Sequence, residues 1–480
     1  MRGSWLLAFV PVACFLACCV ALFVHYKAFD MVGLAAFGFV SLLIGAVFAR
    51  RYASYWEAVM RGIASPTAVS IVVILFVIGI FSELVKVADL SSGFVWLGDA
   101  LGLGAGLVPF FTFLTVCVVA MSTGSSIGTM FTAFPIFYPA GVALGADPAL
   151  MAGAILSGAI FGDNLAPISD TTIISASTQS FRKKVGQADI AGVVRSRAKY
   201  SLTAAGFSSI LFIAIGVFST STTAGASLSI PDTSPKTLVM LVPVGLMMLT
   251  SFVTRDIFKA ISVGLLAGTL VGLATGILVP TDIVSVQDGA LTGFVSAGVH
   301  NIIGTVALVI AVFGIMGVLT EAGVLTRTIG ALQRARWAHT PGGSEASIAL
   351  GISLTTVMFG GVNSASMMTF GPVADQIGAD TNLHPYRRCN VMDSFAMGAA
   401  CVVPFLSAFL FIGSLLTSGY EGVPSLSAVA LFPTVFYPLA LTLVMVFAIA
   451  TGWGRRFEGP GGAEERDPVV AARVETAAAK

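Results

Sequence analysis

Stretches of about 20 apolar residues, the length that a helix needs to cross a bilayer, recur along the whole chain. Of its 480 residues, 56% are hydrophobic and only 10% are charged, which is more apolar sequence than a water-soluble core of this size requires. The pattern indicates an all-α polytopic membrane protein with about 12–14 transmembrane segments. Spans are expected near residues 5–25, 30–49, 67–88, 103–122, 127–142, 149–176, 200–219, 237–253, 257–279, 302–324, 346–360, 364–378, 390–416 and 426–452.

The first apolar run follows Arg2 and looks like the start of a signal peptide. Its apolar stretch is longer than the roughly 7–15 residues that such a leader contains. We therefore interpret residues 5–25 as an uncleaved first span.

Positive charges gather in alternate loops, and such loops face the cytoplasm. This alternation predicts about fourteen crossings of the cell's inner (plasma) membrane with both termini in the cytoplasm. The tail after Arg456 is polar and is expected to be disordered. The charged sets are Arg50, Arg51 and Arg61; Arg182, Lys183, Lys184, Arg195, Arg197 and Lys199; Arg255 and Lys259; Arg327, Arg334 and Arg336; Arg387 and Arg388; and Arg455 and Arg456.

The two halves of the chain resemble each other at an offset of 237 positions (372 minus 135). TGSSIGTMFTAFP (123–135) aligns with FGGVNSASMMTFGP (359–372), and matching prolines and polar clusters at one offset indicate an internal repeat. The matches include Gly124 with Gly361, Met130 with Met367, Thr132 with Thr369, Pro135 with Pro372, Ser157 with Ser394 and Pro167 with Pro404.

The predicted orientation makes these halves inverted, because the span at 67–88 runs outward and its counterpart at 302–324 runs inward. Inverted repeats with interrupted helices are how many secondary transporters build a site at the bilayer midplane. The predicted domains are a first half over 1–220, an inverted second half over 237–456 and a cytoplasmic polar tail over 457–480.

The segment GDNLAPISDTT (162–172) places two carboxylates and a proline inside an expected span. Pro167 should break the helix, and intramembrane carboxylates are costly and usually functional. The oxygen ligands suit sodium or a proton better than a transition metal. The alternative is structural, with Asp170 only capping a half-helix. The candidate ion- or substrate-binding residues are Asp163, Asn164, Asp170, Thr171 and Thr172, with sodium expected at Asp163, Asn164 and Asp170.

Further candidates come from the repeat. Asp393 lies in an apolar run and is expected to have no base nearby, which favours function. The hairpin residues Ser125, Ser126, Asn363 and Ser364 either line the site or let helices pack closely. Ser157, the match of Ser394, completes the set, whereas Asp375, Asp380 and His384 are expected to be structural residues in or beside a polar loop.

Several other classes of protein are disfavoured. A net charge of +1 does not suggest nucleic acid, and no phosphate-binding G-x-x-x-x-G-K-[ST] loop is present for ATP-driven transport. The four histidines fall in predicted loops or at span edges, so no Ser/His or His/Glu set within the spans supports an enzyme buried in the membrane. The six cysteines lack metal spacing, and no cofactor is expected beyond sodium and protons as transported or coupling ions.

GDNLAPISDTT, preceded by GAILSGAIF and followed by IISAS, closely resembles the signature of the NhaC-type sodium/proton antiporters of the ion transporter superfamily, and MSTGSSIGT (121–129) is similar to that family's hydroxyl motif. The second half departs from the pattern, since Met392 precedes Asp393 where the family usually has an acidic pair. Pro404 is also followed by Phe-Leu-Ser rather than Trp-Asn-Thr.

The resemblance implies an inverted-repeat fold, alternating access, and exchange of sodium for protons that compete at intramembrane carboxylates. Related branches exchange small organic acids, so the alternative is a sodium- or proton-coupled transporter or exchanger of a small organic acid or amino acid. The expected partners are sodium, protons and the lipid bilayer, with an organic substrate and a homodimer left open.

Overall fold

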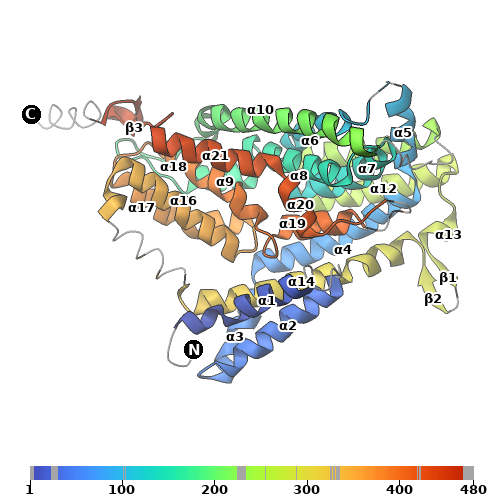
Figure 1. Cartoon of the computed structure of the whole chain (residues 1–480), viewed down its shortest axis with the longest axis horizontal. Coiled ribbons are helices and arrows are strands. Elements are labelled where there is room, and N and C mark those ends of the chain that lie inside the picture. Colours follow the sequence, from blue (N-terminus) through green and yellow to red (C-terminus); the bar gives the residue numbers. More distant parts are fainter. Residues whose placement is uncertain are drawn as a thin grey trace, which may run out of the picture. The chain divides into compact units, whose positions relative to one another are not determined.

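The described residues are mostly helical in the computed structural model, which confirms the predicted class (Figure 1). The structure describes residues 5–22, 31–100, 102, 104–223, 234–254, 256–287, 289–324, 327, 330, 336–418, 420 and 423–468. Two short antiparallel pairs are the strands found there. They are β1 (Ser285–Gln287) with β2 (Ala290–Thr292), and β3 (Phe457–Glu458) with β4 (Glu464–Glu465).

The helices of the first half are α1 (Val10–Val20), α2 (Met31–Val47), α3 (Tyr52–Ile63), α4 (Pro66–Val87), α5 (Leu90–Ala100), α6 (Val108–Thr123), α7 (Ser126–Ala143), α8 (Pro148–Leu165), α9 (Asp170–Ser177) and α10 (Ile190–Thr223). Those of the second half are α11 (Leu241–Thr254), α12 (Ile257–Thr275), α13 (Pro280–Ile283), α14 (Phe294–Glu321), α16 (Pro341–Met358), α17 (Asn363–Ala379), α18 (Pro385–Ala396), α19 (Ala408–Leu416), α20 (Ala428–Leu431) and α21 (Phe436–Thr451).

Four helical segments of the described chain are long and apolar enough to cross a membrane by themselves, and a bent pair raises the number to five. Other expected spans are shorter apolar helices, such as Val32–Val47 and Val108–Thr123. The four segments are Pro148–Ser177, Ile190–Ser219, Phe258–Thr275 and Phe294–Glu321, and the bent pair joins Ala428–Thr434 to Phe436–Thr451 at 53°.

The chain divides into two compact units that cut across the sequence halves. Unit 1 comprises Met1–Gly162, Ser209–Ala322 and Phe409–Phe436, and unit 2 comprises Asp163–Ser208, Gly323–Ala408 and Tyr437–Lys480. The half-helix α9 of the first half therefore belongs with the second-half helices α16, α17 and α18.

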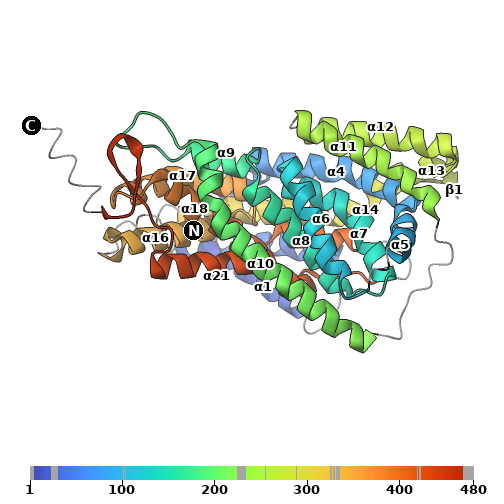
Figure 2. The same cartoon turned by 90° about the horizontal axis from the view of Figure 1, so that it is seen from above.

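In unit 1, α14 packs along α2, α3 and α4 (Figure 1). Small residues allow the closest approach, as is usual between membrane helices. A Cβ at Gly62 of α3 would lie 2.2 Å from the backbone oxygen of Phe313, and one at Gly317 would lie 2.3 Å from that of Ala58. Figure 2 shows α11 and α12 side by side in the same unit.

In unit 2, the α16–α17 hairpin packs on α18, and α9 packs against both α17 and α18 (Figure 1). The turn between α16 and α17 contains Gly360 and Gly361, whose φ angles of 64° and 82° lie in the left-handed region that favours glycine. A glycine also permits the α17–α9 contact, because a Cβ at Gly371 would lie 2.6 Å from Thr178.

The helix boundaries repeat at the offset found in the sequence. Helix α7 begins at Ser126 and α17 at Asn363, and α8 begins at Pro148 and α18 at Pro385, so both pairs stand 237 positions apart (363 minus 126; 385 minus 148). Proline is favoured in the first turn of a helix, which accounts for the second pair. The inverted orientation of the two halves stays a prediction.

Two expectations about loops and tail are wrong. Helix α10 begins at Ile190 rather than near 200, so Arg195, Arg197 and Lys199 lie in a helix and not in a loop. The start of the tail is ordered, because Glu458 is buried and its carboxylate accepts hydrogen bonds from the backbone N–H groups of Arg182 and Lys183 at 2.8 and 2.6 Å. Residues 469–480 lie outside the described part of the chain.

Candidate functional site

The expected interruption of the span at 149–176 is confirmed. Helix α8 ends at Leu165 and α9 begins at Asp170, with Pro167 between them. Proline has no N–H to donate and clashes with the preceding turn, so the helix cannot continue through it. Ser169 caps the new helix by accepting a hydrogen bond from the backbone N–H of Thr171 at 3.2 Å.

Asn164, in the last turn of α8, is fully buried and makes three side-chain hydrogen bonds. Its Nδ2 donates to Oδ1 of Asp393 at 2.6 Å. Its Oδ1 accepts from the hydroxyl groups of Ser201 at 2.6 Å and Tyr437 at 2.8 Å. One amide therefore joins the end of α8 to α10, α18 and α21 through four residues that all belong to unit 2.

A buried ion pair lies beside this amide. One terminal nitrogen of Arg197 lies 2.9 Å from Oδ2 of Asp393, and both side chains are 0% exposed. The same nitrogen donates to the backbone oxygen of Asn164 at 2.7 Å and to Oγ1 of Thr172 at 3.0 Å, and the other donates to Oγ of Ser175 at 3.1 Å. Arg197 thus satisfies a carbonyl group close to the helix break, where lipid offers no partner.

Both members of this pair differ from what the sequence predicted. Arg197 was expected in a positive loop, and Asp393 was expected to have no base nearby. The early start of α10 turns Arg197 inward, and Ser201, four residues further on, lies on the same face and also reaches Asn164. That i, i+4 spacing was the available signal.

Asp163 is 5% exposed and accepts a hydrogen bond from the hydroxyl of Ser169. The Ser169 hydroxyl also lies 2.8 Å from Oγ1 of Thr171. The Asp163 carboxylate, in the last turn of α8, is therefore followed by two hydroxyl oxygens in a row, those of Ser169 before α9 and Thr171 in its first turn. This is the chemistry of an oxygen-ligand site for a small hard cation.

Asp170 is exposed at the start of α9. Its Oδ1 accepts from the backbone N–H of Thr171 at 2.9 Å, and its Oδ2 accepts from the hydroxyl of Ser364 in α17 at 2.5 Å. Because Ser169 is the capping residue, Asp170 is the first residue of the helix rather than its cap. The structure thus brings two of the predicted site residues, Asp170 and Ser364, into contact.

Asn363 has a different surrounding from its neighbour Ser364. With its amide nitrogen facing the carbonyl groups, it donates to the backbone oxygens of Ala396 at 2.9 Å and Gly361 at 3.0 Å. The span expected over 390–416 is also interrupted, because α18 ends at Ala396 and α19 begins at Ala408. The Asn363 amide thus satisfies a carbonyl at the end of α18. Among the predicted residues, Asn363 has contacts that suit a structural role.

The three predicted serines of the first half lie in unit 1. Ser125 caps α7 by accepting from the backbone N–H of Gly128 at 3.2 Å. Ser126 and Ser157 are buried in α7 and α8. The structure defines no geometry between them and the unit 2 residues, so their membership of the site stays a prediction.

Two more arginines that were assigned to a loop are buried in α18. Arg387 pairs with Glu345 at 2.7 Å, and Arg455 shares that carboxylate at 2.7 Å. Arg388 pairs with Asp375 at 2.5 Å. Asp375 is structural, as expected, although it lies in α17 rather than in a loop. Buried cations in unit 2 thus carry matched carboxylates, as buried charges require.

His384 precedes α18 outside the membrane-spanning segments and is also structural. Burial lowers the pKa of this imidazole below its ordinary value, so the ring is neutral at pH 7. Its Nε2 lies 3.2 Å from the backbone oxygen of Gly462, which ties the chain after α21 to the start of α18.

Within the described ranges, no three His, Cys, Asp or Glu side chains gather as ligands for a metal ion. A cation at the helix break would therefore be held by one or two carboxylates together with hydroxyl and backbone oxygens. Sodium suits a set of ligands made mostly of uncharged oxygen atoms, whereas a transition metal prefers imidazole or thiolate ligands.

A helical membrane protein with a span interrupted at a carboxylate and hydroxyl cluster has the construction of a secondary transporter. Comparison with known proteins gives the same class. Residues 1–185 match the model of the Na+/H+ antiporter family. This match confirms the resemblance to sodium/proton antiporters that the GDNLAPISDTT segment indicated.

Two curated relatives are antiporters. The chain is 27% identical over 315 residues to the Na(+)/H(+) antiporter NhaC of Alkalihalophilus pseudofirmus (strain ATCC BAA-2126 / JCM 17055 / OF4), which covers 62% of this chain and 66% of the relative. It is 28% identical over 178 residues to the Malate-2H(+)/Na(+)-lactate antiporter of Bacillus subtilis (strain 168), which covers 37% of this chain and 36% of the relative. The matches thus span less than two thirds of either relative.

Among solved structures, the YdaH transporter of Alcanivorax borkumensis is similar over 84% of this chain and 91% of that chain. The identity is 13% and the TM-score is 0.32, so this likeness carries no argument about fold or function.

Proposed function

We propose that the protein is a sodium/proton antiporter that works by alternating access, with Asp170 and Asp163 as the groups that bind either sodium or a proton. The relative NhaC supports the exchanged ions. The observation that carries the proposal is the contrast between two carboxylates of unit 2. Asp393 is neutralised by Arg197, whereas the described contacts of Asp170 are with neutral donors, Thr171 N–H and Ser364 hydroxyl.

A carboxylate that keeps its charge at a helix interruption can hold a cation. A proton and a sodium ion cannot both occupy it comfortably, because the first removes the charge that attracts the second. Competition at one group is enough for exchange if the carrier changes face only when it is occupied. The hydroxyl oxygens of Ser169, Thr171 and Ser364 would complete the sodium shell.

Asn164, Thr172 and Asp393 have a different part in this proposal. Arg197 contacts all three, and their hydrogen bonds hold the helix break in shape. They act on ion binding through the position of α9 rather than through a free oxygen. We further propose inverted halves, a location in the inner membrane and cytoplasmic termini, with a homodimer left open.

The proposal is tested by ion flux in proteoliposomes that contain the full chain and an internal pH dye. We expect an outward sodium gradient to acidify the lumen, because each exchange brings protons in as sodium leaves. Potassium at the same concentration is the control for a membrane potential artefact. No sodium-dependent pH change, with protein shown to be inserted, would contradict the proposal.

A second function is favoured by one observation, the similarity to the Malate-2H(+)/Na(+)-lactate antiporter. On that hypothesis the carboxylates at the break bind the coupling cation, and a small organic acid is exchanged. Radiolabelled malate and lactate uptake into the same proteoliposomes separates the two functions. Uptake that requires sodium or a pH gradient would favour the organic acid exchanger, and pH change without any added acid would favour the simple antiporter.

Competition also predicts how sodium affinity depends on pH. Below the pKa of the binding carboxylate, each unit fall in pH should weaken the apparent sodium affinity about tenfold if one proton competes. Above that pKa the affinity should be constant, because the group is already charged. Calorimetric titration of the purified protein with sodium chloride across a pH series measures this slope. An affinity independent of pH would show that the proton is carried elsewhere.

A further inference from the structure

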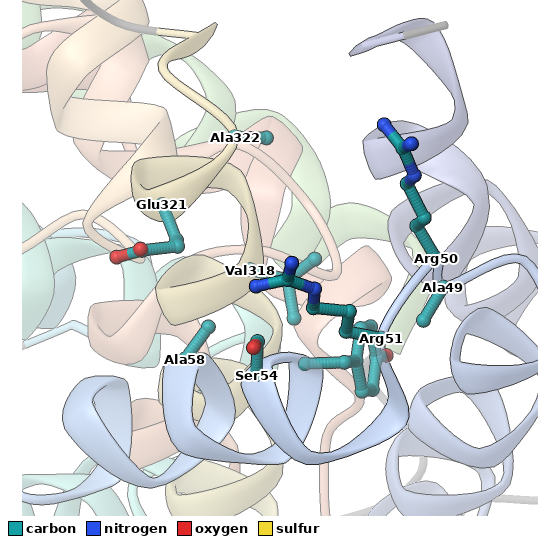
Figure 3. A pocket seen from close by; sticks show the side chains of 9 residues that line it. Ala49, Arg50, Arg51, Ser54, Ala58, Val318, Glu321 and Ala322 are labelled. Atoms are coloured by element: carbon teal, nitrogen blue, oxygen red, sulfur yellow. The ribbon is translucent and has the colours of Figure 1, made fainter. Parts of the chain in front are cut away.

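A pocket of about 390 Å³ lies in unit 1, where the loop after α2 meets α3 and the end of α14. Its lining includes Arg50, Arg51, Ser54, Tyr55 and Glu321. In Figure 3 the Arg51 side chain reaches over Ser54 toward α14, while the carboxylate of Glu321 points away from it. These residues have no part in the site around the helix break.

The pocket carries an excess of positive charge. Its one lining carboxylate, on Glu321, pairs with Arg61 at 3.0 Å. Arg50 and Arg51 are exposed, and neither forms an ion pair with a carboxylate of the described residues. Two guanidinium groups present planar, paired donors that match the oxygens of a phosphate.

The backbone of α3 adds to this preference for an anion. Arg51 is the N-cap residue of α3, and Ser54 lies in its first turn. The N–H groups of a first helical turn have no partner inside the helix and, with the helix dipole, attract negative charge. The side chain of the N-cap residue Arg51 has no hydrogen-bond acceptor, so it does not satisfy these N–H groups.

The length and the aromatic side chains of α3 favour a position of the pocket at the depth of lipid headgroups. Helix α3 has 12 residues, too few to cross a bilayer, and it buries Tyr55, Ala58 and Val59 while Tyr52 and Met60 are exposed. One face of α3 thus packs on α14, while the exposed Tyr52 and Met60 are side chains that suit the membrane interface. The rings of Tyr52 and Trp56 pack edge to face at 6.2 Å, and aromatic residues are enriched at that depth.

The end of α2 beside the pocket presents an apolar surface. Leu43 and Val47 are 54% and 69% exposed, and Phe48 follows them just before the pocket residue Ala49. An acyl chain would cover these side chains, whereas a free phosphate ion would leave them bare. The combination of paired arginines and an adjoining apolar face therefore favours a lipid over a dissolved anion.

We propose that this pocket binds the phosphodiester headgroup of an anionic phospholipid, with Arg50 and Arg51 on the phosphate and the acyl chains along the exposed face of α2. Basic pockets between membrane helices are suited to such headgroups. The inference does not depend on which ions the protein transports.

The test uses the purified full chain in detergent, with phosphatidylglycerol, phosphatidylcholine and inorganic phosphate as separate probes. Native mass spectrometry measures retained lipid, and thermal unfolding measures its effect on stability. We expect phosphatidylglycerol alone to be retained and to raise the melting temperature. The double variant Arg50→Gln with Arg51→Gln should bind it about thirtyfold more weakly, because each cation near an anionic lipid contributes roughly a fivefold factor.

Two further variants keep the proposal open to refutation. Lys236→Gln with Lys259→Gln removes two exposed cations elsewhere in unit 1 and should leave lipid binding unchanged. Ser54→Glu puts a negative charge into the pocket at a first-turn position where glutamate stabilises a helix, so it should abolish lipid binding without unfolding the protein. Retention of phosphatidylglycerol by both pocket variants, equal retention of phosphatidylcholine, or an equal stabilisation by inorganic phosphate would overturn the proposal.

Discussion

Replacing Arg197 by glutamine should lower the free energy of unfolding by about 3–5 kcal/mol, because it leaves the carboxylate of Asp393 buried and uncompensated. Both side chains are 0% exposed, so water cannot replace the lost partner. The substitution also removes the donor to the backbone oxygen of Asn164 near the helix break. Thermal unfolding in detergent, together with the yield of monodisperse protein, measures the effect.

Arg195→Gln is the matched control for this prediction. Arg195 lies in the same helix, two residues before Arg197, but its side chain is exposed. Its loss should therefore change the free energy of unfolding by no more than about 0.5 kcal/mol. The double variant Arg197→Gln with Asp393→Asn should recover part of the loss, because it removes both charges. If Arg197→Gln were as stable as Arg195→Gln, the buried pair would have no structural importance.

Replacing Asp170 by asparagine should abolish sodium-dependent proton flux while the protein stays folded and inserted. Asparagine keeps the shape and can still accept from Thr171 N–H, but it can neither take up a proton nor offer a negative charge to sodium. The flux in proteoliposomes should fall to that of protein-free vesicles. Asp163→Asn should do the same if the two carboxylates share the cation.

Two controls separate transport from structure. Asp380→Asn removes another exposed carboxylate of unit 2, at the end of α17, and should leave flux unchanged. Ser364→Ala removes the hydroxyl group that donates to the Asp170 carboxylate. It should weaken sodium affinity about tenfold, which corresponds to the free energy of one hydrogen bond to a charged group. Near-normal flux in both aspartate variants would assign the helix break to structure alone.

The interrupted helix could be predicted from the sequence because its cause is local. Pro167 forbids the helical hydrogen bond by its own chemistry, and the polar residues around it stand out against an apolar span. The turn between α16 and α17 was predicted for a similar reason, since paired glycines favour left-handed backbone.

The partner of Asp393 could not be predicted in this way. Arg197 lies among other basic residues. Composition cannot distinguish a buried arginine that pairs with a carboxylate far along the chain from an arginine that is exposed to water. Only the packing of α10 against α18 decides which of Arg195 and Arg197 is buried. Helix α3 was missed because Glu57 and Arg61 lower its hydropathy, although Tyr55, Ala58 and Val59 show the i, i+3, i+4 pattern of an amphipathic helix.

The hydrogen bonds of Asn164 also set the order in which unit 2 can assemble during synthesis. Its partners Ser201, Asp393 and Tyr437 leave the ribosome long after Asn164 itself. While the second half is still being translated, the Asn164 amide lacks two of its final partners, Asp393 and Tyr437. Unpaired polar groups are costly in lipid, so the interrupted helix is expected to stay in or near the translocon during that time. Tyr437 lies in α21, so the hydrogen bonds of Asn164 are complete only after that helix has been synthesised. A nascent chain that stops before α21 would therefore hold its interrupted helix without the Tyr437 donor.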